Sequence, residues 1–323
     1  MNTAAKLGTY VLGLAVVFGG TWGVGNLVGP QATPQKPVTA GHDMSQMSKQ
    51  PTTQSAPATT QGASDTPGGL QVSQNGYTLN PLTAAKAGAP TDFQFTVTGP
   101  SGKPVTDYQV EHDKKLHFIV VSRDLSSFQH VHPEMSADGT WSVKIAFPAA
   151  GTFRAFADFT PTGGQALTLG ADIQVAGDFQ PKPLKAVSRT SEVDGYTVTL
   201  DGDLVPGQSS KLTLNVSKDG KPVTDLQPYL GAYGHLVALR AGDLAYLHVH
   251  PDGAPGDGKT QPGPGITFYA EAPSGGDYRL FLDFQHGGAV HTADFTAKAG
   301  EGAVKPGAEP TAKNDHDSTP HGH

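Results

Sequence analysis

The stretch FQFTV at residues 93–97 alternates apolar and polar side chains, and KLTLNV at residues 211–216 does the same. Successive side chains of a β-strand point to opposite faces, so this alternation indicates strands with one buried face. Buried strands are also predicted at residues 116–121 and 235–239, and proline and Gly-Gly turns separate such segments. No window after the N-terminal 29 residues has a convincing helical period. The sequence therefore predicts an all-β fold.

The chain also repeats itself. The phrase GKPVTD at residues 102–107 recurs at residues 220–225, and HVHP at residues 130–133 recurs 118 residues later, at residues 248–251. Each repeat unit has about 100 residues, the size of one β-sandwich domain. We therefore expect two tandem immunoglobulin-like β-sandwich domains. The expected organisation is an N-terminal signal-anchor or transmembrane helix at residues 1–29, a disordered linker at 30–69, a first sandwich at 70–177, a second at 178–299 and a disordered, histidine-containing tail at 300–323.

Composition excludes several classes of protein. The chain has 323 residues and no cysteine, so disulfides, thiolate zinc sites, cysteine nucleophiles and iron–sulfur clusters are ruled out. With 41 glycines and 26 prolines it is too rich in turn residues for a helical bundle. The net charge of −7 argues against nucleic acid as a partner. The 13 histidines are the unusual feature, and their placement directs the functional argument.

The N-terminus has the composition of a membrane segment. No charged residue lies between Lys6 and Lys36, and residues 7–29 are mostly apolar. A helix over them would be about 35 Å long, enough for a hydrocarbon core of about 30 Å. No clear A-x-A site follows, so we expect an uncleaved single-pass anchor in the cell membrane, with cleavage as the alternative. The long polar region that follows places the domains on the extracytoplasmic side.

Partners are suggested by the same helix. It has two G-x-x-x-G spacings, Gly19/Gly23 and Gly25/Gly29, which could pack two copies into a homodimer. A glycine-rich helix also produces such spacings by chance. The predicted flexible linker at residues 30–69 would let the domains reach a neighbouring metal transporter, which is the other partner we expect.

The histidines carry the chemistry. His130 and His132 are two residues apart, so on a strand their imidazoles lie on the same face, and His117 precedes His130 by 13 residues. If the two strands form a hairpin, three neutral imidazoles converge into a site for Cu, Zn, Ni or Fe. The second repeat has the same spacing and adds histidines after its last conserved strand. The predicted metal ligands are His117, His130, His132, His235, His248, His250, His286 and His291. Accessory ligands are expected among His112, Met135, Asp158, Asp283, His42, Met44, Met47, His316, His321 and His323.

Other interpretations remain open. Polar histidines on an exposed strand face would do nothing, and the chain would then be an immunoglobulin-like interaction module. A bicupin enzyme also uses H-x-H, but it needs a glutamate a few residues later. After His250 the next glutamate is Glu271, and Glu134 follows His132 too closely. We therefore expect a metal-binding protein and not an enzyme, with the bicupin as the enzymatic alternative.

Three phrases resemble a known family. Residues 117–133, residues 281–293 and the anchor ending in Val-Gly-Pro at residues 28–30 are similar to membrane-anchored, secreted proteins of high-GC bacteria with a duplicated HxHP β domain. That family is often associated with heavy-metal and copper handling. The resemblance implies an association with copper or another heavy metal. Copper is the ion we expect, and zinc is the alternative. The expected function is copper sequestration or delivery outside the cytoplasm, through a histidine cluster in each repeat.

Overall fold

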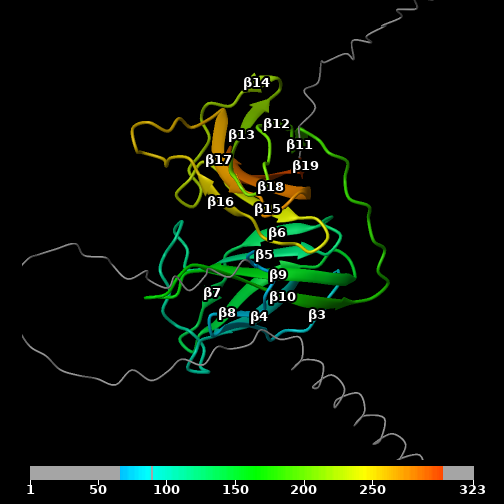
Figure 1. Cartoon of the computed structure of the whole chain (residues 1–323), viewed down its shortest axis with the longest axis vertical. Coiled ribbons are helices and arrows are strands. Elements are labelled where there is room, and N and C mark those ends of the chain that lie inside the picture. Colours follow the sequence, from blue (N-terminus) through cyan, green and yellow to red (C-terminus); the bar gives the residue numbers. More distant parts are fainter. Residues whose placement is uncertain (1–65, 89, 301–323) are drawn as a thin grey trace, which may run out of the picture. The chain divides into compact units, whose positions relative to one another are not determined.

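The structure, a computed structural model, describes residues 66–88 and 90–300, and in this part every regular element is a strand (Figure 1). The all-β prediction is confirmed. The predicted anchor, almost all of the predicted linker and almost all of the tail lie outside the described residues. Within the described ranges, no helix is long and apolar enough to cross a membrane.

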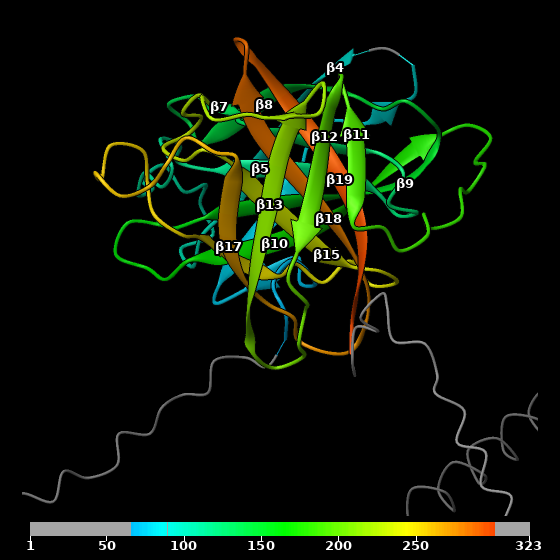
Figure 2. The same cartoon turned by 90° about the horizontal axis from the view of Figure 1, so that it is seen from above.

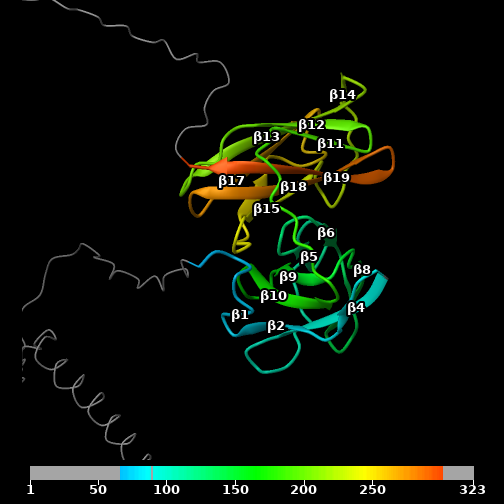
Figure 3. The same cartoon turned by 90° about the vertical axis from the view of Figure 1, so that its right-hand side faces the viewer.

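The first repeat folds as two five-stranded sheets, with strand orders β1-β2-β4-β8-β7 and β3-β10-β9-β5-β6 (Figure 3). Strands β5 and β6 form an antiparallel hairpin at the edge of the second sheet. The strands are β1 (Ser73–Gln74), β2 (Tyr77–Pro81), β3 (Ala85–Lys86), β4 (Pro90–Thr98), β5 (His117–Ser122), β6 (Phe128–Val131), β7 (Glu134–Met135), β8 (Thr140–Ala146), β9 (Gly151–Phe159) and β10 (Leu167–Ala176).

The second repeat also has two sheets. One follows the order β11-β12-β13-β17-β16, with β14 beside β13, and the other is β15-β18-β19. Figure 2 shows β11, β12, β13 and β17 side by side. Internal duplication is therefore visible in the fold as well as in the sequence. The strands are β11 (Thr190–Val193), β12 (Tyr196–Asp201), β13 (Ser209–Lys218), β14 (Lys221–Pro222), β15 (His235–Arg240), β16 (His248–Pro251), β17 (Gly265–Glu271), β18 (Gly276–His286) and β19 (Ala289–Ala299).

Each repeat has its own hydrophobic core between its sheets. In β4 the apolar residues of the alternating stretch, Phe93, Phe95 and Val97, are fully buried. The ring of Phe95 stacks on that of Phe118 from the opposite sheet, with centroids 4.3 Å apart. Burial of aromatic rings from both sheets is what closes a sandwich, because each ring removes a large apolar area from water.

A third apolar cluster joins the two repeats. It includes Ile119 and Val121 of β5 and Val237 and Leu239 of β15. Phe118 and Val120 of the same β5 strand belong to the core of the first repeat. Both faces of β5 are therefore buried, which explains why its sequence is a continuous apolar run and does not alternate.

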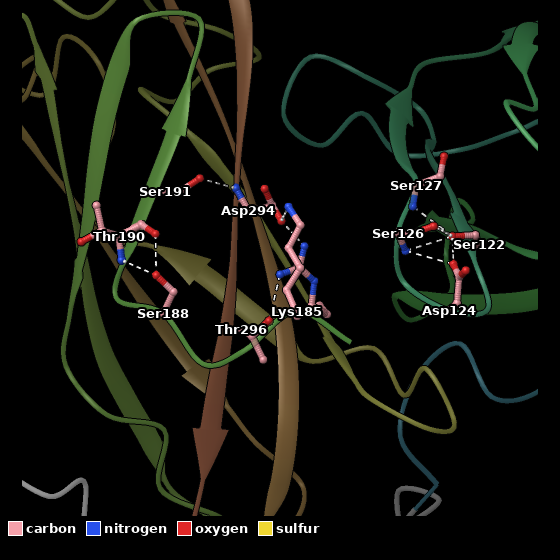
Figure 4. Close-up of polar contacts among 11 residues, drawn as sticks. Ser122, Asp124, Ser126, Ser127, Lys185, Ser188, Thr190, Ser191, Asp294 and Thr296 are labelled. Carbon is pink, nitrogen blue, oxygen red and sulfur yellow. Dashed lines mark hydrogen bonds and ion pairs between the residues drawn. The ribbon is translucent and has the colours of Figure 1, made fainter. Parts of the chain in front are cut away.

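A polar turn joins β5 to β6. The Ser122 hydroxyl accepts hydrogen bonds from the backbone N–H groups of Ser126 and Ser127, at 3.1 and 2.9 Å, and donates to Asp124 at 2.6 Å (Figure 4). Leu125, inside this turn, has a φ of 60°, in the left-handed region. These local hydrogen bonds hold the turn in one conformation, and that conformation sets the register of the hairpin.

Candidate metal centre

The hairpin register brings three predicted histidines together. In β5 and β6, Phe118 lies opposite Val131 and Ile119 lies opposite His130. Continuing the register by one residue places His117 opposite His132. Side chains two apart on a strand, or directly opposite across a hairpin, share a face. His117, His130 and His132 therefore lie on one face of the hairpin, as the H-x-H spacing predicted.

The nitrogens of these histidines converge closely. Nδ1 of His117 lies 3.1 Å from Nε2 of His130 and 3.2 Å from Nε2 of His132. Among the described residues, they are the group of three whose ligand atoms all lie within 4.8 Å of one another. Two imidazole nitrogens bound to one tetrahedral ion at about 2.05 Å are about 3.3 Å apart. The cluster thus has nearly the spacing that a bound ion requires. We call these three residues the histidine triad.

Groups outside the triad fix the tautomers of two of its members. Nε2 of His117 lies 3.2 Å from the carbonyl oxygen of Glu111, and Nδ1 of His130 lies 2.9 Å from Oδ2 of Asp283. A carbonyl and a carboxylate only accept hydrogen bonds, so both ring nitrogens are donors. If both rings are neutral, Nδ1 of His117 and Nε2 of His130 are left with lone pairs that face each other.

The turn before β5 supplies one of those acceptors. His112 and Asp113 have φ values of 48° and 62°, in the left-handed region that side chains rarely adopt. Glu111 and Lys114 close this turn through two backbone hydrogen bonds. The turn directs the Glu111 carbonyl to His117. In the second repeat, the Tyr229 carbonyl accepts a hydrogen bond from Nε2 of His235 at 2.9 Å in the same way.

Burial lowers the pKa of two members of the triad. The pKa of His117 falls to about 3 and that of His132 to about 3, chiefly because of burial and then because of the neighbouring His130. Burial is also the main reason why the pKa of His235 falls to about 4. Neutral imidazoles with free lone pairs are the form in which histidine binds metals.

The second repeat contributes to the surroundings. The ring of His235 has its centroid 6.2 Å from those of both His117 and His130, and 5.4 Å from that of His112. A cavity of about 250 Å³ is lined by these four histidines together with Asp158 and other residues of both repeats. Asp158 is held by a hydrogen bond from Thr168 at 2.9 Å, and burial raises its pKa to about 6. The cavity adjoins the triad.

The structure places other predicted ligands elsewhere. Nδ1 of His286 bonds the Tyr196 hydroxyl at 2.7 Å, and its Nε2 lies 3.1 Å from Asp225. Nδ1 of His291 lies 2.8 Å from Asp194. Both ligand nitrogens of His286 are therefore engaged at the end of the β18–β19 hairpin. Met135 packs against the apolar core of the first repeat.

The remaining predicted ligands are only partly described. His248 and His250 belong to β16, which pairs with β17 and not with β15. The H-x-H strand of the first repeat, β6, pairs instead with β5, the strand that precedes it. The side chains of these two residues lie outside the description, so the predicted cluster in the second repeat stays a prediction. The flanking residues His42, Met44, Met47, His316, His321 and His323 also lie outside the described residues.

The sequence did not reveal the cross-repeat partner. It placed Asp283 among the accessory ligands, whereas the structure pairs Asp283 with His130 of the first repeat. One signal of this arrangement was available. The apolar run at residues 118–121 leaves no polar face for solvent, so a second surface must cover it.

The comparisons with known proteins place the chain in a family. The family described as "Domain of unknown function (DUF8832)" matches residues 71–177 and again residues 191–301. The two matches cover more than half of the chain, which therefore belongs to this family, and the duplication of its β domain is confirmed. No curated protein sequence matches the chain.

Solved structures show only distant likeness. A protein of Corynebacterium diphtheriae described as membrane anchored is 12% identical, and the match covers 72% of this chain and 60% of that one, with a TM-score of 0.21. The Yersinia pseudotuberculosis adhesin InvE is 14% identical over 70% of this chain and 60% of its own, with a TM-score of 0.21. The chain thus spans 60% of the length of each of these two structures.

Proposed function

We propose that the protein binds a transition-metal ion at the histidine triad and serves in copper sequestration or delivery. The observation that carries the proposal is the 3.1 Å contact between Nδ1 of His117 and Nε2 of His130. Their outer partners, the Glu111 carbonyl and the Asp283 carboxylate, accept hydrogen bonds from the N–H groups of the two rings. Two lone pairs at that distance repel each other unless a cation lies between them.

A proton on His117 is a poor candidate for that cation. The pKa of His117 is lowered to about 3, chiefly by burial, so this ring stays neutral at physiological pH. A metal ion supplies the positive charge without protonating a buried ring. Imidazole nitrogens suit Cu(II) and Zn(II), and the Irving–Williams order favours Cu(II) at such a site. Copper is therefore the proposed ion and zinc the alternative.

The donor set supports exchange of the ion. Structural zinc sites are closed by four protein ligands, whereas the triad supplies three and adjoins a cavity of about 250 Å³. A position left open can accept a ligand from a partner, which is what hand-over of an ion requires. We propose a membrane metal transporter as that partner and the extracytoplasmic face of the cell membrane as the location. The predicted N-terminal anchor, with its capacity for homodimer formation, supports this placement.

An enzyme is the second candidate. Catalytic zinc sites also keep three protein ligands and an open position for water. The triad and its cavity fit that description, although the glutamate that a cupin needs is missing from the expected positions. Turnover of a small substrate with Fe(II), Mn(II) or Zn(II) would favour an enzyme over a carrier.

Metal titration of the purified full chain in detergent tests the proposal. We expect one tight Cu(II) or Zn(II) equivalent that is lost in His117→Ala and in His132→Ala. His291→Gln is the matched control, because His291 is also partly buried and bonded to a carboxylate, but it lies outside the triad. A chain that binds no ion, or whose tight binding survives loss of both His117 and His132, would contradict the proposal.

A further inference from the structure

We infer that the metal-binding unit is the pair of repeats, because Asp283 of the second repeat is the positioning residue for the metal-binding nitrogen of His130 in the first. This inference rests on the proposed function and specifies how the site is built. Asp283 touches the histidine and not the ion, so it acts on the metal only through the imidazole.

The contact is buried and direct. Nδ1 of His130 lies 2.9 Å from Oδ2 of Asp283, and the two side chains are only 4% and 6% exposed. Two residues before each partner, Phe128 and Phe281 stack with their ring centroids 4.1 Å apart. Because side chains two apart on a strand share a face, β6 and β18 present matching pairs of groups to each other. The aromatic pair aligns the strands, and the polar pair then meets.

Asp283 is itself held in place. The hydroxyl of Thr292, its register partner on β19, donates to Oδ1 at 2.6 Å. Oδ2 is thereby directed to His130, so the two carboxylate oxygens have different partners. A carboxylate fixed at both oxygens can fix the plane of an imidazole as well as its tautomer.

The effect on the ion follows from the tautomer. With the proton held on Nδ1 by Asp283, Nε2 of His130 keeps its lone pair beside Nδ1 of His117. Without the carboxylate, the proton can move to Nε2 and remove one of the three donors. Outer carboxylates of this kind also raise the basicity of the ligand nitrogen, and their loss weakens metal binding about 10–100-fold.

The first repeat provides no such partner from its own strands. Its counterpart of Asp283 is Asp158, which lies opposite His117 in the β5–β9 register, as Asp283 lies opposite His235 in the β15–β18 register. Asp158 is held by Thr168 as Asp283 is held by Thr292. The carboxylate that reaches His130 is nevertheless the one from the second repeat. A bound ion would therefore join the repeats through His130.

The experiment is a Cu(II) titration of the full chain with four variants. We expect Asp283→Ala to bind Cu(II) about 10–100-fold more weakly, and Asp283→Asn, which keeps an acceptor oxygen, to lie between it and the wild type. Thr292→Val should weaken binding less than Asp283→Ala. The matched control is Asp294→Asn, since Asp294 pairs with Arg279 and Lys185 in the same sheet but contacts no histidine of the triad. Its affinity should match that of the wild type.

The electron paramagnetic resonance spectrum of bound Cu(II) separates a positioning role from a purely structural one. Reorientation of His130 in the Asp283 variants should change the copper hyperfine coupling, whereas a general loss of stability would leave the spectrum of the bound fraction unchanged. If the wild type binds no copper, the proposed function fails. If the wild type binds copper through His117 and His132 while Asp283→Asn and Thr292→Val match Asp294→Asn in affinity and spectrum, this inference alone is overturned.

Discussion

The ring of Phe128 stacks on that of Phe281 across the two repeats, with centroids 4.1 Å apart and planes 5° apart. A related contact joins Tyr246 to Phe156, with centroids 5.7 Å apart. Tyr246 follows Phe128 by the same 118 residues that separate the two HVHP phrases, and Phe156 corresponds to Phe281 in the duplicated chain. The repeats thus meet through the same surface of each copy, as in a symmetric dimer fused into one chain.

Removing one ring from this interface should destabilise the whole tandem pair. We expect Phe281→Ala to lower the free energy of unfolding by about 3–5 kcal/mol, the usual effect of emptying a buried aromatic position. Phe281 is only 4% exposed. Urea denaturation measures the change, and Val290→Ala, at a site 43% exposed, is the control. Equal stability of the two variants would show that the repeats do not pack together in solution.

The turn that sets the hairpin register makes a second prediction. Ser122 is 7% exposed and its hydroxyl serves two backbone N–H groups and Asp124. Ser122→Ala removes the hydroxyl acceptor of the Ser127 N–H, while the Ser126 N–H keeps Asp124 as an acceptor at 3.1 Å. The loss should reduce stability by about 1–3 kcal/mol. Metal affinity should fall too, since the register places His130 beside His117. In the control, Ser136→Ala, the lost hydroxyl bonds Asp138 and Thr140 in an exposed turn. Metal binding should be unchanged there. A loss of affinity in both variants would show that the effect on metal binding does not come from the Ser122 turn.

Much of the triad was predictable because its information is local. The H-x-H spacing puts His130 and His132 on one face of a strand, and a short polar loop makes the preceding strand its neighbour. The structure adds the exact pairing of Ile119 with His130, which depends on the Ser122 turn. The alternation in β4 likewise predicted the buried positions of Phe93 and Phe95. Strand periodicity and hairpin geometry are properties of short segments, so they can be deduced from sequence.

The cross-repeat contact was not predictable in the same way. The offset of 118 residues reveals that two copies exist, but not which of their surfaces meet. The pairing of His130 with Asp283 depends on docking of one sandwich on another, through side chains such as Ile119 and Val237. Its two members are 153 residues apart in sequence. Their proximity is a property of the packed pair of domains.

His286 and His291 show that spacing alone does not determine the surroundings of a side chain. They follow the Asp283 strand closely enough to be counted as ligands in the sequence. The β18–β19 register instead places His286 opposite Ala289, at the end of the hairpin, where Tyr196, Asp194 and Asp225 bond the two rings. The three partners come from neighbouring elements that the sequence could not position.

The structure therefore predicts a stabilising role for this second pair of histidines. His286→Gln and His291→Gln should each lower the free energy of unfolding by about 0.5–1.5 kcal/mol, the net contribution of an intramolecular hydrogen bond. The affinity for Cu(II) at the triad should stay within about twofold, because neither ring belongs to it. Titration of the two variants beside His132→Ala provides the comparison. A tenfold loss of affinity in either glutamine variant would show that the substituted histidine is a metal ligand.

Acid should destabilise the metal-free protein through the triad itself. The pKa values of His117 and His132 are lowered to about 3, mainly by burial and then by the neighbouring His130, whereas an unfolded chain has a histidine pKa of about 6.5. Between those values the unfolded state binds more protons than the folded state. Stability must therefore rise with pH across this window and fall as the pH drops from about 6.5 towards 3.

Urea denaturation with a chelator present, at half-unit steps of pH, measures this slope. The interval from pH 6.5 to 5.5 is the most informative, because carboxylates with the usual pKa of about 4 titrate mostly below it. Asp158, whose pKa is raised to about 6, titrates inside the interval but is present in both of the proteins that are compared. A His117→Asn, His132→Asn double variant is the matched comparison, since it removes both lowered pKa values and keeps side chains of similar polarity. Its stability should change less with pH than that of the wild type over this interval. Identical slopes would mean that the rings of His117 and His132 are exposed to water in solution, and that the buried cluster on which metal binding depends does not form.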